Sequence, residues 1–276
     1  MASEIRDLDH LCIHTITTKP LEFELACAKY AALGVKGISI WRDAVDGLDH
    51  HAVRECLRTN ELTPASYVRG GFFPALQVEK RDAAIEDNIA MLQEAAAMEI
   101  PMLVLVCGAE PRQALQTSRD QIREGIEAIL PEAKKLNVKL AIEPLHPMYA
   151  DTRSAITSLA QANDMAEYFS DDYLGIALDV YHLWFDNDLE RQIKRCGSNN
   201  NLFAFHICDW NVPTTDMLLD RGLMGEGCIP LKQIRGWVEK AGFRGFNEVE
   251  IFSNKFWEGD QDLFLDQIVN AYRQHS

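Results

Sequence analysis

The chain has 276 residues, of which 47% are hydrophobic and 25% are charged, a composition that suits a globular protein with a sizeable core. Its formal net charge of −15 disfavours a polyanionic partner, so we expect no nucleic acid among its partners. No apolar stretch approaches the ~20 residues that span a bilayer, and the acidic start does not resemble a signal peptide, so we expect no membrane association.

Strand-like and helix-like segments alternate along the whole chain. The strand-like runs cover residues 8–16, 36–41, 63–68, 102–106, 139–143, two runs that begin at 174 and 202, and 246–252. The helix-like segments cover 20–33, 48–60, 79–98, 112–136, 154–169, a short insert between the sixth and seventh strands, 231–241 and 262–273.

Eight such pairs predict an α/β fold, a single (β/α)8 TIM barrel domain over residues 1–276. A doubly wound open sheet is the competing architecture. No GxGxxG sequence follows the first strand, however, which argues against a dinucleotide-binding fold of that kind. The seven cysteines show no CxxC spacing and lie mostly in apolar runs. Reduced thiols of this kind predict a cytoplasmic protein rather than a disulfide framework or a zinc knuckle.

Potential metal ligands stand at the carboxyl ends of four successive strands, which meet at one mouth of a barrel. These residues are Glu143, Asp179, His206 and Glu250. Three carboxylates and one imidazole suit a hard or borderline divalent ion, with Mn²⁺, Mg²⁺ or Co²⁺ preferred to Zn²⁺. Taken singly, each Glu also fits a surface ion pair and the His a core position. Their shared place at four strand ends favours a metal site.

Motifs in the second half of the chain resemble one family. They are LDVYH at 178–182, AFHICDW at 204–210, the loop at 225–227 and GFRGFNEVEIF at 242–252. Together they resemble the xylose isomerase-like TIM barrel superfamily, specifically its sugar phosphate isomerase/epimerase family. The resemblance implies a Mn²⁺, Mg²⁺, Co²⁺ or Zn²⁺ site of two Glu, one Asp and one His, matching Glu143, Asp179, His206 and Glu250. It also implies that His182, in the DxxH motif, contacts a substrate oxygen.

The resemblance implies a reaction as well. In ketose epimerases of this family, the metal holds adjacent carbonyl and hydroxyl oxygens while two Glu ligands exchange protons with opposite faces of the substrate. A divalent cation stabilises the enediolate that forms when a proton leaves the carbon beside a carbonyl. We therefore expect a divalent-metal-dependent isomerase or epimerase of a ketose, keto-glycoside or keto-cyclitol. Glu143 and Glu250 are its expected catalytic acid/base pair.

Further candidates for substrate binding each have a second interpretation. His146 is either a general base or a loop histidine that bonds to backbone. Arg221 either neutralises a substrate oxygen or pairs with the neighbouring Asp at the surface. Trp41 and Trp210 form either an apolar wall against a sugar ring or part of the core. His14, at the end of the first strand, faces either the mouth or the core.

The sequence Arg69-Gly70-Gly71-Phe72-Phe73 is interpreted as a turn that forms a flexible lid, with a mouth loop packing on itself as the alternative. The loop at 225–227 offers backbone N–H groups, but its central acid opposes an anion. We therefore expect a small, unphosphorylated sugar as the substrate and partner. The sequence is also compatible with a homo-oligomer.

Other activities share this fold. A dehydratase of a keto-cyclitol, of the inosose or dehydroshikimate type, would expel a β-hydroxyl from the same enolate with His146 or His182 as the acid. An abasic-site endonuclease is disfavoured by the acidic charge and by the lack of a histidine at the ends of the third and fourth strands. A non-catalytic barrel subunit of a larger complex is the remaining alternative.

Overall fold

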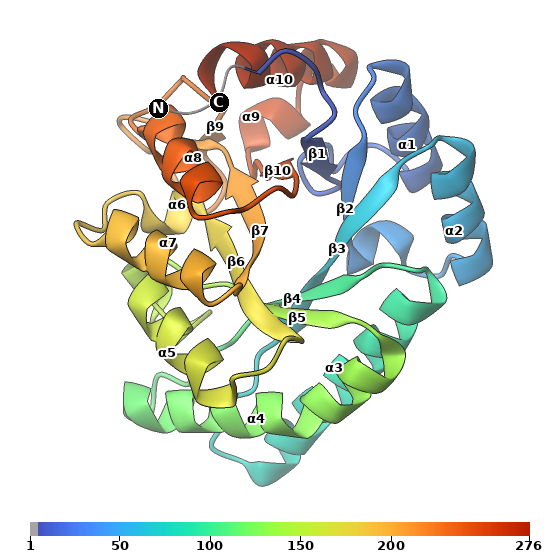
Figure 1. Ribbon diagram of the computed structural model, residues 1–276. Coiled ribbons are helices and arrows are strands. Elements are labelled where there is room, and N and C mark those ends of the chain that lie inside the picture. Colours follow the sequence, from blue (N-terminus) through green and yellow to red (C-terminus); the bar gives the residue numbers. More distant parts are fainter. Residues whose placement is uncertain (1–4) are drawn as a thin grey trace.

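Eight parallel strands close into a barrel in the computed structural model, which describes residues 5–276 (Figure 1). Around the barrel the order is β1, β2, β3, β4, β5, β6, β7 and β10, and β10 pairs with β1 to close it. The strands are β1 Leu11–His14, β2 Gly37–Trp41, β3 Thr63–Gly71, β4 Met102–Val106, β5 Lys139–Ile142, β6 Leu174–Asp179, β7 Leu202–Ile207 and β10 Asn247–Val249. The predicted (β/α)8 TIM barrel is therefore confirmed.

Helices form a ring around the strands, as Figure 1 shows. They are α1 Phe23–Ala32, α2 His50–Thr59, α3 Val78–Ala97, α4 Leu115–Leu136, α5 Leu159–Phe169, α7 Leu189–Ser198, α8 Leu231–Lys240 and α10 Gln261–His275. Short elements lie in the loops that follow the strands: η1 Arg42–Val45, η2 Pro147–Tyr149, α6 Val180–Leu183, α9 Asn254–Trp257, and a two-stranded hairpin of β8 Asp209–Trp210 and β9 Arg221–Gly222. None of the helices in residues 5–276 combines the length and apolarity of a membrane span.

The position of the site follows from the two-residue period of the strands. Side chains alternate between the helix layer and the inside of the barrel. A small apolar cluster contains Val68, Met102, Val104, Ala141, Ala177 and Ala204 and is separate from the large core under the helices. Two residues beyond the alanines of β5, β6 and β7, on the same face, come Glu143, Asp179 and His206. The barrel therefore places a polar layer directly above this small apolar cluster.

The first and last barrel strands are shorter than the predicted runs 8–16 and 246–252, and two other local predictions differ for a clear physical reason. Helix α5 begins at Leu159 rather than near residue 154, because the Ser158 side chain accepts a hydrogen bond from the Gln161 amide and caps the helix there. The lid prediction is wrong, because Gly70 and Gly71 belong to β3 and pair with β4. A Cβ on Gly71 would lie 2.1 Å from the Val106 carbonyl oxygen. Glycine at this position therefore allows close strand packing instead of loop movement.

Candidate active site

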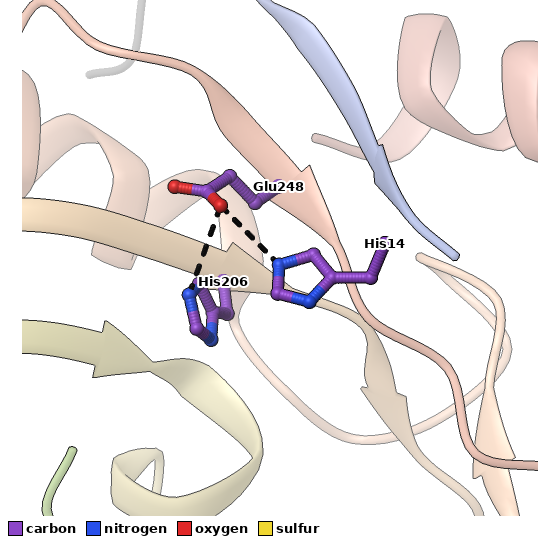
Figure 2. A group of neighbouring side chains, drawn as sticks. All are labelled: His14, His206 and Glu248. Carbon is purple, nitrogen blue, oxygen red and sulfur yellow. Dashed lines mark ion pairs between the residues drawn. The ribbon is translucent and has the colours of Figure 1, made fainter. Parts of the chain in front are cut away.

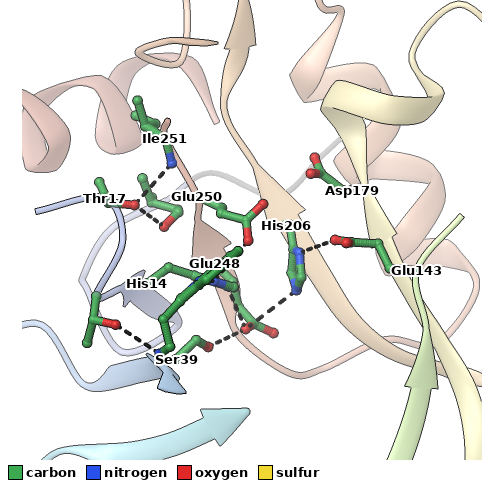
Figure 3. A network of polar contacts seen from close by, with 12 residues as sticks. His14, Thr17, Ser39, Glu143, Asp179, His206, Glu248, Glu250 and Ile251 are labelled. Carbon is green, nitrogen blue, oxygen red and sulfur yellow. Dashed lines mark hydrogen bonds and ion pairs between the residues drawn. The ribbon is translucent and has the colours of Figure 1, made fainter. Parts of the chain in front are cut away.

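The carboxyl ends of β5, β6, β7 and β10 bring the four predicted ligands together. Glu143, Asp179, His206 and Glu250 each offer one ligand atom, and these atoms lie within 4.8 Å of one another. All four side chains are buried. Figure 3 shows Glu143 and Glu250 on opposite sides of the His206 ring. The group therefore has the compact set of oxygen and nitrogen donors that a divalent metal ion requires.

Arg221 supplies a positive charge to this group from the β8–β9 hairpin. Its Nη1 donates to Asp179 Oδ2 at 2.9 Å and to Glu250 Oε2 at 2.8 Å, and the side chain is 3% exposed. Its Nη2 lies 3.3 Å from Nε2 of the buried His182. The interpretation of Arg221 as a surface residue paired with Asp220 is wrong, because the hairpin turns the guanidinium into the barrel mouth.

The charges of the group indicate whether it fits a cation. Burial raises the pKa of Asp179 to about 7, against the opposing effect of Arg221 and with the support of the Glu250 and Glu143 charges. Burial also disfavours ionised Glu250, but His14 and Arg221 hold its pKa well below the usual range. Arg221 contacts Asp179 and Glu250 but not Glu143, and protons on the neighbouring His206 and on Asp179 supply further positive charge to the buried carboxylates. A divalent ion would supply that charge, so these residues fit a metal.

His206 carries a strongly shifted pKa in the same group. Burial disfavours the imidazolium, but the 3.1 Å contact between its Nδ1 and Glu143 Oε1, together with the charges of Glu248 and Glu250, raises the pKa to about 10. A metal ligand must be a neutral imidazole. His206 would therefore have to lose one proton to serve as a metal ligand.

This shift predicts how the metal-free protein responds to pH. Histidine in the unfolded chain titrates near 6.5, and His206 in the folded chain near 10, so its extra proton stabilises the folded state fully below pH 6.5. That contribution is lost as the pH rises toward 10. We expect the free energy of unfolding, measured by urea titration in EDTA, to fall by up to about 3 kcal/mol between pH 7 and 9. This decrease should be smaller in His206→Gln. A free energy of unfolding that does not change between pH 7 and 9 in the parent protein would contradict the prediction.

A fourth acid, Glu248, lies beside His206 and His14 and was not predicted (Figure 2). Its Oε2 is 3.3 Å from His14 Nε2 and 3.8 Å from His206 Nε2, and Ser39 donates a 2.6 Å hydrogen bond to it. Both histidine Nε2 atoms are buried, and within residues 5–276 neither has a hydrogen-bond partner. The sequence held a signal for Glu248. It lies two residues before Glu250, and side chains two residues apart on a strand point to the same side.

His14 faces the mouth, which resolves the two interpretations of its position. Its Nδ1 lies 3.2 Å from Glu250 Oε1, and Trp41 Nε1 is within 3.2 Å of the same nitrogen. The Trp41 ring makes an edge contact with Phe252, with 5.2 Å between centroids. Trp41 is therefore part of the wall of the mouth as well as a hydrogen-bond partner inside it.

His146 and Trp210 lie together on another part of the mouth. His146 Nδ1 accepts a 3.1 Å hydrogen bond from the Met148 amide at the start of η2, as the loop interpretation expects. Its ring is 5.5 Å from that of Trp210, which stacks on Tyr181 at 4.7 Å. His146 is also half-buried, and burial lowers its pKa. This aromatic cluster offers an apolar wall with one neutral imidazole.

The loop at 225–227 is held from inside by Asp209. The Gly225 and Ile229 amides donate to the two oxygens of the Asp209 carboxylate, both at 2.9 Å. The Glu226 amide donates to the Leu223 carbonyl. These amides are already engaged, which supports the expectation that this loop does not bind a phosphate.

Comparison with known proteins identifies the class. A family model described as xylose isomerase-like TIM barrel matches residues 27–268, so the chain belongs to this family. Protein SMc04130 from Sinorhizobium meliloti 1021 is similar, with 42% identity, a TM-score of 0.93, and coverage of 97% of this chain and 98% of that one. A search of the curated proteins finds no match.

Two further solved structures share the fold at low identity. The IolI protein, solved with a binding zinc atom, has 17% identity and a TM-score of 0.82, and the match covers 95% of this chain and 96% of that one. D-psicose 3-epimerase, solved in the presence of D-fructose, has 16% identity and a TM-score of 0.77, with the same coverage of both chains.

Proposed function

We propose that this protein is a divalent-metal-dependent sugar isomerase or epimerase that acts on a ketose, keto-glycoside or keto-cyclitol. The observation that carries the proposal is the convergence of Glu143, Asp179, His206 and Glu250 on one buried point. An epimerase and a zinc-binding protein among the structural neighbours support it. The seven cysteines, all unpaired, support a cytoplasmic location.

The four converging residues would hold the cation. When bound, a divalent ion would polarise the substrate carbonyl and stabilise the negative charge that develops as a proton leaves the neighbouring carbon. Three carboxylates and one imidazole favour Mn²⁺, and Mg²⁺, Co²⁺ and Zn²⁺ are compatible with the same donors.

Glu143 and Glu250 would move the proton. They approach the site from β5 and β10, on opposite sides of His206 (Figure 3). Arg221 and His14 hold the two oxygens of Glu250 and favour its ionised form, so in the metal-free protein Glu250 carries no proton of its own. Removal of a proton on one face and its return on the other inverts a carbon centre. Its return to the neighbouring carbon interconverts aldose and ketose.

Residues around the mouth would orient the sugar. His182 and Arg221 are buried beside the ligand group, where their N–H groups would donate hydrogen bonds to substrate oxygens. Trp41, and separately His146 with Trp210, would provide apolar faces for the ring. Among residues 5–276, a second possible ligand group consists of His14, His206 and Glu248, and it shares His206 with the first. These two groups do not supply the additional histidines that the metal cluster of an abasic-site endonuclease requires.

Turnover of keto-sugars in D₂O by the Mn²⁺-loaded protein tests the proposal. An epimerase or isomerase incorporates solvent deuterium into a product of the same composition. A product lighter by one water would assign the dehydratase reaction instead. No exchange into any ketose, keto-glycoside or keto-cyclitol would refute the proposal.

Glu248 leads to a prediction about metal affinity. A ligating histidine commonly donates its other N–H to a carboxylate, which orients the ring. Glu248 Oε2 lies 3.8 Å from His206 Nε2 and would accept this N–H after a small shortening of that distance. We expect Glu248→Gln to weaken Mn²⁺ binding, measured by calorimetry, about 10–100-fold. Glu132→Gln, at the surface, is the control. Equal affinity in both variants would contradict an orienting role for Glu248.

A further inference from the structure

A cavity of about 610 Å³ opens beside the candidate metal site. Its wall includes Trp41, Phe252, Arg69 and Arg153. Trp41 contacts His14 inside the site, and the ring of Phe252 lies 5.0 Å from the Arg221 guanidinium. A molecule that reaches the metal site can therefore also occupy this cavity.

Arg69 is held in the cavity wall by aromatic rings. It is half-buried, and its guanidinium carbon lies 4.9 Å from the ring centroid of Phe72 and 5.6 Å from that of Trp41. Because Arg69 is part of β3, its backbone belongs to the rigid barrel. The stacking orients the guanidinium and leaves its N–H donors available.

Arg153 lies in the same wall, in the loop after β5. It is also half-buried, with its guanidinium carbon 5.6 Å from the Tyr149 ring centroid. Its amide donates to the Tyr149 carbonyl and its carbonyl accepts from the Gly108 amide, so its backbone is anchored at both groups. Both arginines therefore have defined positions.

Neither guanidinium has a carboxylate partner. Within residues 5–276, Arg69 and Arg153 form no ion pair and no side-chain hydrogen bond, although the chain carries a net charge of −15. Burial and the charge of Arg153 lower the pKa of Arg69, against the attraction of Glu143 and Glu250. Asp43 and Asp46, in the same wall, are exposed, and the charge of Asp43 also raises the pKa of Arg69 without forming an ion pair with it. Two like charges in a partly dehydrated wall are stabilised by an added anion.

We propose that Arg69 and Arg153 bind an anionic oxygen group of the substrate, a carboxylate or a phosphate, at the end remote from its reacting carbonyl. This proposal rests on the function proposed above and narrows the substrate to an acidic keto-sugar. A guanidinium matches both groups, because its planar fork donates two parallel hydrogen bonds. The Gly225 and Glu226 amides of the loop at 225–227 are already engaged, so the two arginines, and not this loop, would supply the donors for the anion.

Equilibrium binding of three ketoses tests the proposal. Calorimetry with the Mn²⁺-loaded chain compares D-fructose, D-fructose 6-phosphate and 5-keto-D-gluconate, which are neutral, phosphorylated and carboxylated. We expect at least one anionic ketose to bind tenfold or more tightly than fructose, and the preferred one identifies the group. Arg69→Met with Arg153→Met should remove this preference. Methionine keeps much of the apolar contact with the rings, and Arg112→Met, at the surface, is the control.

Two results would overturn the inference. One is that fructose binds as tightly as both anionic ketoses, or that none of the three sugars binds. The other is an anionic preference that survives in the double variant. Deuterium exchange on the same samples separates this inference from the proposed function. An arginine-dependent preference without exchange would refute only the isomerase, and exchange without such a preference would refute only the anion site.

Discussion

Replacement of either proposed acid/base residue, as Glu143→Gln or Glu250→Gln, is expected to lower the rate of solvent deuterium exchange by about 10²–10⁴-fold. Glutamine keeps the shape and one oxygen ligand of glutamate but cannot take up a proton at neutral pH. The effect should therefore appear in kcat rather than in folding. Exchange rates measured by mass spectrometry on Mn²⁺-loaded protein give the result.

Metal content must be measured for each variant, because both glutamates are also proposed ligands. Glu132→Gln, whose side chain pairs with Lys135 at the surface, is the matched control and should exchange at the parent rate. If Glu143→Gln or Glu250→Gln keeps its metal and exchanges deuterium at nearly the parent rate, the acid/base assignment is wrong.

Loss of Arg221 is expected to have the largest effect on stability. Arg221→Met leaves Asp179 and Glu250 buried without their shared cation, and breaking a buried pair of this kind costs about 3–5 kcal/mol of unfolding free energy. Urea titrations in EDTA measure the loss. Added Mn²⁺ should recover more stability in the variant than in the parent, because the ion supplies the positive charge that the variant lacks.

Arg195→Met provides the comparison for this prediction. Arg195 pairs with Asp164 and Glu167 at the surface, where an ion pair contributes about 1 kcal/mol or less. Equal destabilisation by Arg221→Met and Arg195→Met would show that the buried arginine does not balance the charges of the site.

The barrel could be predicted because its repeating units leave a clear pattern in the sequence. Apolar runs such as 102–106 form fully buried strands, and helix-length segments separate them. The residues that end β5, β6 and β7 could be found for the same reason, since parallel strands place their carboxyl ends at one mouth. Glu143, Asp179 and His206 converge as a direct consequence of this geometry.

Features that depend on loops and on pairing between strands could not be read in the same way. The β8–β9 hairpin turns Arg221 inward, and nothing local in its sequence distinguishes this from a surface pair. Glycines at 70 and 71 suggested movement, whereas they allow β3 to approach β4. The unpaired state of Arg69 depends on side chains from distant parts of the chain, so it appears only in three dimensions.

Anomalous diffraction at the manganese edge, from crystals of the Mn²⁺-loaded protein, tests the central claim most directly. We predict one fully occupied ion within coordination distance of Glu143, Asp179, His206 and Glu250, with the four side chains converging on it. An ion bound elsewhere, or no ion at these residues at saturating Mn²⁺, would contradict the proposed metal site and the reaction built on it.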